Sequence, residues 1–434
     1  MRSVVFIVTL TLLTGAVVIG QQDARELAPR VPIVRDLAAT RKDVYRLSLA
    51  ASQFARVIAI QNGVDLQLRA IGPSGDQLIV MDREEGMKGV ERVSIIAGAA
   101  GEYRVEVTGV NKDAVTGKYE IWLDELREAT VTDRTQVAAE RTFARGRELH
   151  QQPTAAAKRQ AVSLYQEALP LWRAAGDRAG EATTLHNLGD LHKLLDEYAQ
   201  ADVAYEEALT LRRALGDQHG EAATLLNIGA NYYVQGHKDM ALDYFMRALP
   251  LWKTVGDPLG EVPTLNNIAV VYGSIGEYQK ALIYHRQALP LRQAIGDRVG
   301  EALTLNNLGM IYRFLDENDK ALAYYSRAQE IRRQLDDRRG EGITLNNMAA
   351  VYDELGEFDK ALDLYNRSLD IKRALGDKRG EASTLNNVGE AFCWIASSGC
   401  ASGSTRWSRI GFALRRRVRR TPRSRPSSAT SMRR

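Results

Sequence analysis

Cysteine and histidine, which often build metal sites and covalent catalytic centres, are scarce in this sequence. The 434 residues include two cysteines, Cys393 and Cys400, and six histidines. The first 392 residues therefore offer no disulfide, no cysteine metal ligand and no cysteine nucleophile. No histidine pairs with a second histidine or a cysteine at ligand spacing, and no phosphate loop, serine elbow or placed carboxylate pair is present. We expect no catalysis, no cofactor and no metal.

Acidic residues and lysine are missing from the C-terminal segment. Residues 393–434 hold 11 arginines and no Lys, Asp or Glu. The formal net charge of +4 therefore comes from this segment, and residues 1–392 are mildly acidic. An acidic body argues against nucleic-acid binding by the protein as a whole. One alternative stays open, in which these arginines, with Trp394, Trp407 and Phe412, bind nucleic acid or an anionic surface.

Long apolar runs are also rare, and the one that occurs lies at the N-terminus. Arg2 precedes Val4–Ile19, which is apolar apart from Thr and Gly, and Gly20 follows. This pattern predicts a signal peptide over residues 1–20, cut before Gln21, and export to the periplasm or the extracellular space. The alternative is an uncleaved membrane anchor, although the run is shorter than the roughly 20 residues of a membrane span.

After a polar linker over 21–40, apolar and polar residues alternate in short segments between Gly-rich turns. These segments are 43–50, 56–61, 65–71, 103–109 and 119–126. Such spacing predicts a small antiparallel β-sandwich over 41–128. Asp65 and Asp76 lie near turns, where isolated carboxylates favour turn formation over a cation site.

The turns of this region carry a family resemblance. Gly63-Val64-Asp65-Leu66, Gly72-Pro73-Ser74-Gly75 and Gly101-Glu102-Tyr103 resemble the recurring turns of the bacterial pre-peptidase C-terminal type of β-sandwich. The resemblance implies an accessory module of a secreted protein.

From about residue 132 the sequence repeats itself every 40 residues. Gly-Asp recurs at 176, 216, 256, 296 and 376, with Asp336-Asp337 at the remaining step, and Gly-Glu recurs at 180, 220, 260, 300, 340 and 380. Six occurrences at one spacing predict a repeat solenoid. Each unit has two segments of helical period, such as 179–195 and 358–375. Gly376 is expected to end a helix in a left-handed conformation and Asp377 to cap the next one.

Small residues are expected where the paired helices cross most closely. The first helices carry Gly189, Gly229, Ala269, Gly309, Ala349 and Gly389, and the second carry Ala201, Ala241, Ala281, Ala321 and Ala361. We expect large side chains to fill the space beside them: Tyr232, Tyr272, Tyr312 and Tyr352, with His192 and Phe392 at the ends of the series. Prolines inside second helices predict local bends at Pro170, Pro250 and Pro290.

This pattern, with GDRxGExxTLNNLGxxY as its core, resembles the tetratricopeptide repeat in the long-helix form of kinesin light chains. The resemblance covers about residues 132–392, as one divergent opening pair at 133–175, five full pairs and one incomplete helix. It implies a multidomain chain in which the β-sandwich precedes an all-α superhelical solenoid. First helices line a concave groove in this family, so the resemblance also implies a protein or peptide ligand there. The oligomeric state stays open.

Two columns of side chains follow from that alignment. Residues expected to face the groove are His186, Leu226, Asn266, Asn306, Asn346 and Asn386, and, one turn further, Asp190, Ala230, Val270, Met310, Ala350 and Glu390. An asparagine amide offers both a donor and an acceptor to a peptide backbone. The neighbouring asparagines occur in every unit, which favours a bond to the preceding connector over ligand contact: Asn187, Asn227, Asn267, Asn307, Asn347 and Asn387.

The order of segments carries a further resemblance. A signal peptide, a sandwich and GDRxGE repeats, with Leu126-Arg127-Glu128-Ala129-Thr130 between them, resemble bacterial proteins that end in a CHAT domain, a caspase-like peptidase fold. That domain is missing here. The alternative function is therefore the regulatory or substrate-recruiting part of a peptidase whose catalytic domain lies outside this chain.

The repeat breaks off after Phe392. Residues 393–434 are rich in Arg and Ser and do not continue the pattern. We interpret them as a disordered, aberrant tail produced by a frameshift or truncation. Sequencing of the locus tests this hypothesis, which fails if no downstream reading frame continues the repeat. The prediction for the chain is an exported scaffold that binds an extended peptide.

Overall fold

The structure, a computed structural model, describes residues 24–38, 41–82, 88–110 and 116–399. The expected signal peptide and the arginine-rich residues from 400 onward lie outside these ranges. The chain divides into two compact units. The first comprises Met1–Val271 and Ala294–Gly296, and the second comprises Tyr272–Gln293 and Asp297–Arg434.

The N-terminal region forms two β-sheets, as the sequence predicts. The strands are β1 (Arg25–Glu26), β2 (Ile33–Leu37), β3 (Lys42–Leu49), β4 (Gln53–Asn62), β5 (Leu66–Ile71), β6 (Gln77–Met81), β7 (Lys88–Ile96), β8 (Gly101–Gly109) and β9 (Gly117–Glu128). One sheet has the order β1-β3-β8-β5-β6 and the other β2-β9-β4-β7. All pairings are antiparallel except that of β1 with β3.

All five predicted strands are present, and the structure adds four more. The segment expected to be a linker, 21–40, contributes β1 and β2, which pair with β3 and β9. Both are short edge strands, and β2 buries only one of its five side chains fully. The burial of β2 alternates, but its sequence does not show this clearly, because Arg35 lies on the more buried side and Val34 on the exposed side.

The first helix, α1 (Val131–His150), lies along the edge strands of both sheets. The Ser94 backbone N–H and hydroxyl of β7 donate to the fully buried Glu140 carboxylate, at 2.8 and 2.9 Å. Beyond β6, Arg147 pairs with Asp82 at 2.9 Å. An unpaired strand edge is a site for unwanted pairing, so α1 protects two edges at once.

A short connection holds α1 firmly to β9. Thr130 caps the helix, and its side chain and backbone form a reciprocal capping box with Asp133. Two hydrogen bonds from the Arg127 guanidinium reach the same carboxylate, at 2.5 and 3.0 Å. They hold the pKa of Asp133 well below its ordinary value. The sandwich therefore joins the helices through a tightly bonded junction.

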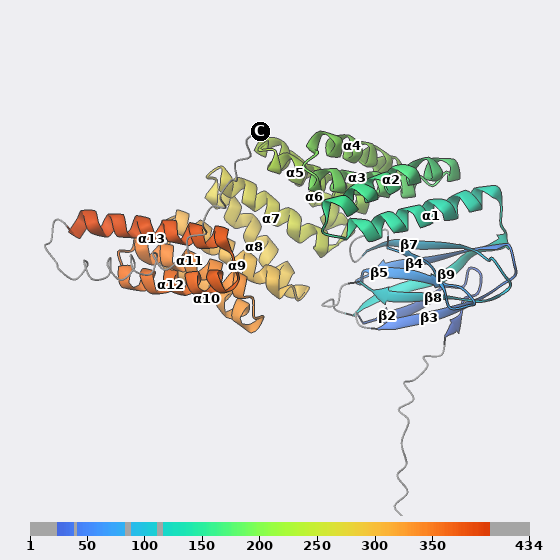
Figure 1. Cartoon of the computed structure of the whole chain (residues 1–434), viewed down its shortest axis with the longest axis horizontal. Helices are drawn as coiled ribbons and strands as arrows, with labels where there is room; N and C mark the ends of the chain where they lie inside the picture. The colour runs from blue at the N-terminus through green and yellow to red at the C-terminus, as the bar shows by residue number, and fades with distance from the viewer. Residues whose placement is uncertain (1–23, 39–40, 83–87, 111–115, 400–434) are drawn as a thin grey trace, which may run out of the picture. The chain divides into compact units, whose positions relative to one another are not determined.

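The helices after α1 follow the 40-residue pattern. They are α2 (Ala155–Ala175), α3 (Arg178–Leu194), α4 (Tyr198–Leu215), α5 (Gln218–Val234), α6 (Lys238–Val255), α7 (Pro258–Ser274), α8 (Tyr278–Ala294), α9 (Arg298–Phe314), α10 (Asn318–Gln334), α11 (Arg338–Glu354), α12 (Phe358–Ala374) and α13 (Lys378–Gly399). Within each unit, antiparallel pairs such as α3 with α4 and α11 with α12 pack together (Figure 1). The prolines lie inside α2, α6 and α8, which continue through them.

Helix boundaries arise from Gly and Asp, as predicted. Gly376 has a φ of 68°, and the Asp377 carboxylate accepts from the Gly380 N–H at 2.8 Å. Asp336, which replaces glycine in its repeat, also has a positive φ, of 52°. Asp is one of the few residues besides Gly that visits this region readily, because its short side chain bonds locally.

The last helix departs from the predicted boundary. α13 continues to Gly399, seven residues beyond Phe392. In earlier repeats a Gly or Asp with positive φ ends the first helix at the equivalent position, as Asp316 and Gly356 do. That position is Ala396 in α13. Alanine strongly favours the helix, so the turn that should separate two helices does not form there.

Glycines in the first helices face aromatic rings of the second helices. A Cβ atom on Gly189, Gly229 or Gly309 would lie 2.5 to 2.7 Å from the nearest ring atom of Tyr205, Phe245 or Tyr325, respectively. The expectation that the first-helix tyrosines fill this space is therefore wrong. Tyr232, Tyr272 and Tyr312 instead stack on the second-helix tyrosines Tyr244, Tyr284 and Tyr324, with ring centroids 5.3 to 5.7 Å apart.

The close contact between first-helix glycines and second-helix rings, here called the interlock, can be tested with two matched glycine variants. In Gly309→Ala the new methyl group collides with the Tyr325 ring, so we expect the free energy of unfolding to fall by about 1–3 kcal/mol. Gly389 occupies the same repeat position, but no atom of the described side chains and backbone lies within 4 Å of a Cβ built there. Gly389→Ala should be neutral or stabilising by up to about 1 kcal/mol, because Ala favours the helix. Urea unfolding measures both, and equal effects would contradict the interlock.

Candidate ligand-binding face of the first helices

The predicted groove residues lie on one face of the first helices, here called the first-helix face: residues 186 and 190 of α3 and their repeat equivalents. Their exposure varies more than the repeat alone suggests. His186, Leu226, Asn266 and Asn346 are half-buried, Asn386 is exposed, and Asn306 is only 6% exposed. One turn further, Asp190 is half-buried and Met310 is exposed.

In three repeats the second asparagine, Asn227, Asn347 or Asn387, reaches the face residue of the preceding repeat. The Asn347 Nδ2 donates to the Asn306 Oδ1 at 3.2 Å, and the Asn387 Nδ2 donates to the Asn346 Oδ1 at 3.3 Å. The predicted bond to the preceding connector is therefore wrong for these residues, whose partner lies 41 residues earlier on the neighbouring first helix. We call these cross-repeat bonds the amide ladder.

The amide ladder uses the carbonyl oxygen of the Asn346 side chain and leaves its NH2 group for a ligand. The carbonyl oxygen of Asn346 already accepts from Asn387. Among the residues that the structure describes, no acceptor takes a hydrogen bond from its Nδ2. A half-buried amide N–H without an acceptor suits a carbonyl oxygen of a ligand.

In the first compact unit, His186 takes the place of the face asparagine in the amide ladder. The His186 Nε2 lies 3.2 Å from the Asn227 Nδ2, and its Nδ1 lies 3.2 Å from the Thr224 Oγ1. The Thr224 hydroxyl donates to the Gly220 carbonyl, so it can only accept from the imidazole. This assigns the neutral imidazole with its proton on Nδ1.

Burial keeps that imidazole neutral. Removal from water, with smaller contributions from Arg212 and Lys193, lowers the pKa of His186 to about 3 against the opposing effect of Asp190. Asp190 accepts from the Tyr205 hydroxyl at 2.6 Å and from the Lys193 ammonium at 3.3 Å. This end of the face is therefore a packed polar network.

Apolar side chains flank the first-helix face in the second compact unit. Leu303 and Met310 of α9 and Ile343 of α11 are 42%, 38% and 43% exposed. They lie one helical turn before or after Asn306 and Asn346, on the same side of their helices. In the second compact unit the first-helix face thus offers apolar contacts around amides. In the first compact unit it offers charged and polar groups.

A buried hydrogen bond between consecutive repeats was missed by the sequence reasoning. In four repeats the fully buried threonine of the TLNN-type motif accepts from a long side chain 12 residues earlier, in the preceding second helix. The pairs are Trp172–Thr184, Arg212–Thr224, Arg332–Thr344 and Lys372–Thr384, at 2.9, 3.0, 2.6 and 2.5 Å. Among the described residues, Trp252 Nε1 and Thr304 Oγ1 have no hydrogen-bond partner at the equivalent places. The recurring threonine is visible in the sequence. Its donors are Trp, Arg and Lys, however, and a search for one repeated residue type does not connect them.

A family comparison agrees with this architecture. The tetratricopeptide repeat model matches overlapping segments that together span more than half of the chain: 155–214, 194–254, 220–294, 260–334, 300–374 and 342–394. The chain belongs to the tetratricopeptide repeat (TPR) family. A comparison with curated proteins finds no match.

The TPR chain is also similar to several solved structures, all at low sequence identity. BtubC from P. vanneervenii is 23% identical, covering 57% of this chain and 93% of that one, with a TM-score of 0.43. Aspartyl phosphate phosphatase F from Bacillus subtilis is 13% identical, with coverage of 60% and 72% and a TM-score of 0.46. The apo form of RapI is 18% identical, with coverage of 65% and 88% and a TM-score of 0.49.

The described part of the TPR chain was also searched for metal-binding and membrane-spanning features. It contains no group of three or more His, Cys, Asp or Glu side chains placed to hold a metal ion. The Ser74 hydroxyl donates to Asp76, which fits the turn-forming role expected for that carboxylate. No helix in the same residues has the length and apolar character needed to cross a membrane.

The neutral histidine of the TPR face predicts a pH effect. An unfolded histidine binds a proton below about pH 6.5, whereas folded His186 does so only near pH 3. Between these two pH values the unfolded state binds a proton that folded His186 does not, so acid favours the unfolded state. The free energy of unfolding therefore falls progressively as the pH falls from about 6.5 towards about 3. His186→Asn, which restores the residue of later repeats, should make the free energy of unfolding fall less between pH 7 and pH 4.5. Parallel urea-unfolding profiles for the two proteins would contradict the neutral assignment.

Proposed function

We propose that this TPR protein is an exported scaffold whose first-helix face binds an extended peptide segment of another protein. Its TPR fold is consistent with a protein-interaction scaffold. The observation that carries the peptide proposal is the amide ladder, in which Asn347 and Asn387 hold the carbonyls of Asn306 and Asn346, while the half-buried Asn346 Nδ2 has no acceptor among the described residues.

The ladder favours recognition of a peptide backbone over recognition of a particular side chain. The Asn346 side-chain N–H matches a carbonyl oxygen of an extended chain, which every peptide carries. Because Asn387 holds the Asn346 carbonyl, little side-chain entropy is lost when a ligand binds. This donor is thus arranged in advance of binding.

The surroundings of the ladder give the peptide its proposed chemistry. Leu303, Met310 and Ile343 are exposed beside Asn306 and Asn346. Apolar side chains of the peptide would bury this surface while its backbone contacts the amides. The body of the chain is acidic, which argues against nucleic acid as the ligand of this face.

Export rests on the apolar run Val4–Ile19 after Arg2. The pre-peptidase C-terminal-like turns of the sandwich, such as Gly72-Pro73-Ser74-Gly75, support the same proposal, since modules of this type are typical of secreted proteins. N-terminal sequencing of the protein from the secreted or periplasmic fraction should begin at Gln21. Retention of residue 1 in a membrane fraction would favour the uncleaved anchor.

The peptide proposal predicts how selected ligands respond to substitutions. Peptides are selected from a random library on the purified full-length protein, and their affinities are measured by isothermal titration calorimetry. Asn346→Ala should weaken binding about 10-fold, because it removes one hydrogen bond to the backbone and disrupts its bond with Asn387. Met310→Ala should weaken peptides that carry large apolar side chains.

A control variant separates this face from the rest of the solenoid. Asn366 lies in the second helix α12, so Asn366→Ala makes the same change away from the first-helix face. It should leave the affinity unchanged. Equal losses in Asn346→Ala and Asn366→Ala, or selection of peptides that Asn346→Ala binds normally, would refute the amide-ladder proposal.

A further inference from the structure

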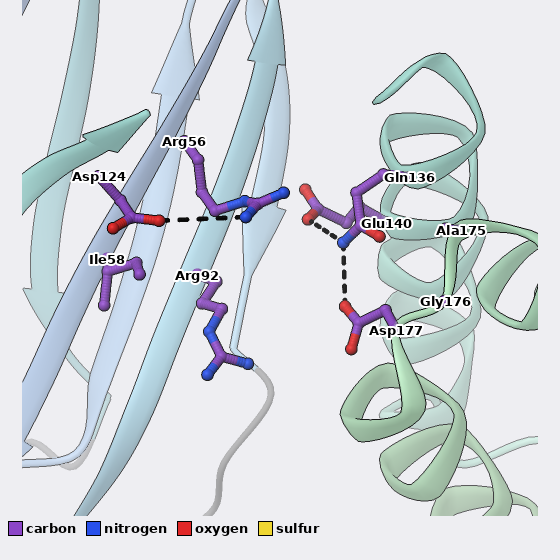
Figure 2. Close-up of a pocket in the computed structure, with 9 residues that line it drawn as sticks. All are labelled: Arg56, Ile58, Arg92, Asp124, Gln136, Glu140, Ala175, Gly176 and Asp177. Carbon is purple, nitrogen blue, oxygen red and sulfur yellow. Dashed lines mark hydrogen bonds and ion pairs between the residues drawn. The ribbon is translucent and has the colours of Figure 1, made fainter. Parts of the chain in front are cut away.

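A polar cavity of about 400 Å³ lies between the outer face of one sheet of the sandwich and the first helices. Its sheet wall carries Arg56 of β4 and Arg92 of β7, and its helical wall carries Gln136 and Glu140 of α1 and the α3 cap Asp177. Figure 2 shows the two arginines with Asp124 on one side of the space, and Glu140 and Asp177 on the other. All of these residues belong to the first compact unit.

Arg92 is the one charged group in this lining without a partner among the described residues. Arg56 pairs with Glu125 at 2.7 Å. Glu140 accepts from Ser94 and Gln136. Asp177 accepts from the Gly180 N–H and from the Gln136 Nε2. Arg92 is half-buried on the strand face that borders the cavity.

A half-buried guanidinium without a counter-charge favours an anionic group from outside. Its planar fork of N–H donors matches a carboxylate, which can accept two parallel hydrogen bonds. An anion alone does not fit the whole cavity, however, because Glu140, Asp177 and Asp124 also line it. The carboxylates of the helical wall favour a positive group. The two walls therefore suit a small molecule that carries one charge of each sign.

The lining also limits the rest of the ligand. Ile58 and Ala175 are the apolar side chains among the nine residues that line the cavity. A large apolar substituent would find little surface to bury. A neutral polar substituent finds the Gln136 amide and the arginine N–H groups nearby.

We propose that this cavity binds a free α-amino acid with a neutral polar side chain. Its carboxylate pairs with Arg92, and its ammonium group lies against Asp177 on the helical wall. This site is separate from the first-helix face and independent of the peptide proposal. Gln136 bonds to both Glu140 and Asp177, at 3.1 and 2.9 Å, so a ligand here also contacts the bonds that join the sandwich to the repeats.

Isothermal titration calorimetry of the full-length protein with L-glutamine and its two truncated forms tests the proposal. The first form, 4-carbamoylbutanoate, lacks the ammonium group, and the second, 4-aminobutanamide, lacks the carboxylate. L-glutamine should bind at one site, with each truncated form at least about 10-fold weaker because one charge-assisted contact is lost. Absence of glutamine binding, or equal binding of a truncated form, overturns the proposal.

Matched variants assign the contacts. Arg92→Gln should weaken glutamine binding at least about 10-fold, whereas Arg104→Gln, the same change on β8 of the other sheet, should not. Asp177→Asn keeps a side chain that caps helices well and should weaken binding. Asp337→Asn, the same change at the α11 cap, should leave binding intact. Equal binding by Arg92→Gln and wild type, with unchanged unfolding midpoints, overturns the assignment.

Discussion

The hydrogen bond from a buried donor in one repeat to a threonine in the next holds four of the six described junctions between consecutive repeats and fixes the spacing there. Thr344 accepts from Arg332 at 2.6 Å, while its own hydroxyl donates to the Gly340 carbonyl. Every polar atom in this buried contact thus has a partner. Because Thr344 precedes Asn346 by two residues on α11, the bond that positions the threonine also positions the first-helix face.

At the junctions that contain Thr224, Thr344 and Thr384, consecutive repeats therefore have two polar connections. The threonine bond lies inside the stack, and the amide ladder lies on its face. Hydrophobic packing alone tolerates sliding of one helix over another, whereas directional bonds in a dry interior do not, since a displaced donor would be left unsatisfied. The chemical identity of the donor matters less than its reach, because Trp172, Arg212 and Lys372 all reach their threonine.

The sequence was most informative where one residue type meets one local requirement. Gly376 and Asp377 were predicted correctly, because a left-handed turn and a helix cap each depend on the backbone of a few neighbouring residues. The strands with clear alternation were found for the same reason. In contrast, β1 and β2 form only because β3 and β9 provide their partners. The partner of Asn347 was assigned wrongly, because the choice between a connector and Asn306 depends on how two first helices pack.

The sandwich and the repeats share α1, which belongs to both. Repeat arrays need a cap on their terminal surfaces, and the sandwich contacts the first repeat through Ser94, Glu140 and the hydrophobic cluster around Phe143 and Trp172. The capping box at Thr130 then sets where α1 begins. The sandwich is consequently part of the same compact unit as the first repeats.

A double-mutant cycle on Arg332 and Thr344 tests the central claim most directly. The free energies of unfolding of wild type, Arg332→Met, Thr344→Val and the double variant give the coupling between the two side chains. The account predicts a coupling of about 1.5–3 kcal/mol, as for a buried hydrogen bond with a charged donor. It predicts additive effects for Trp252→Phe with Thr264→Val, because the Trp252 Nε1 has no hydrogen-bond partner. Additive effects at Arg332 and Thr344 would contradict the claim that this bond sets the repeat spacing.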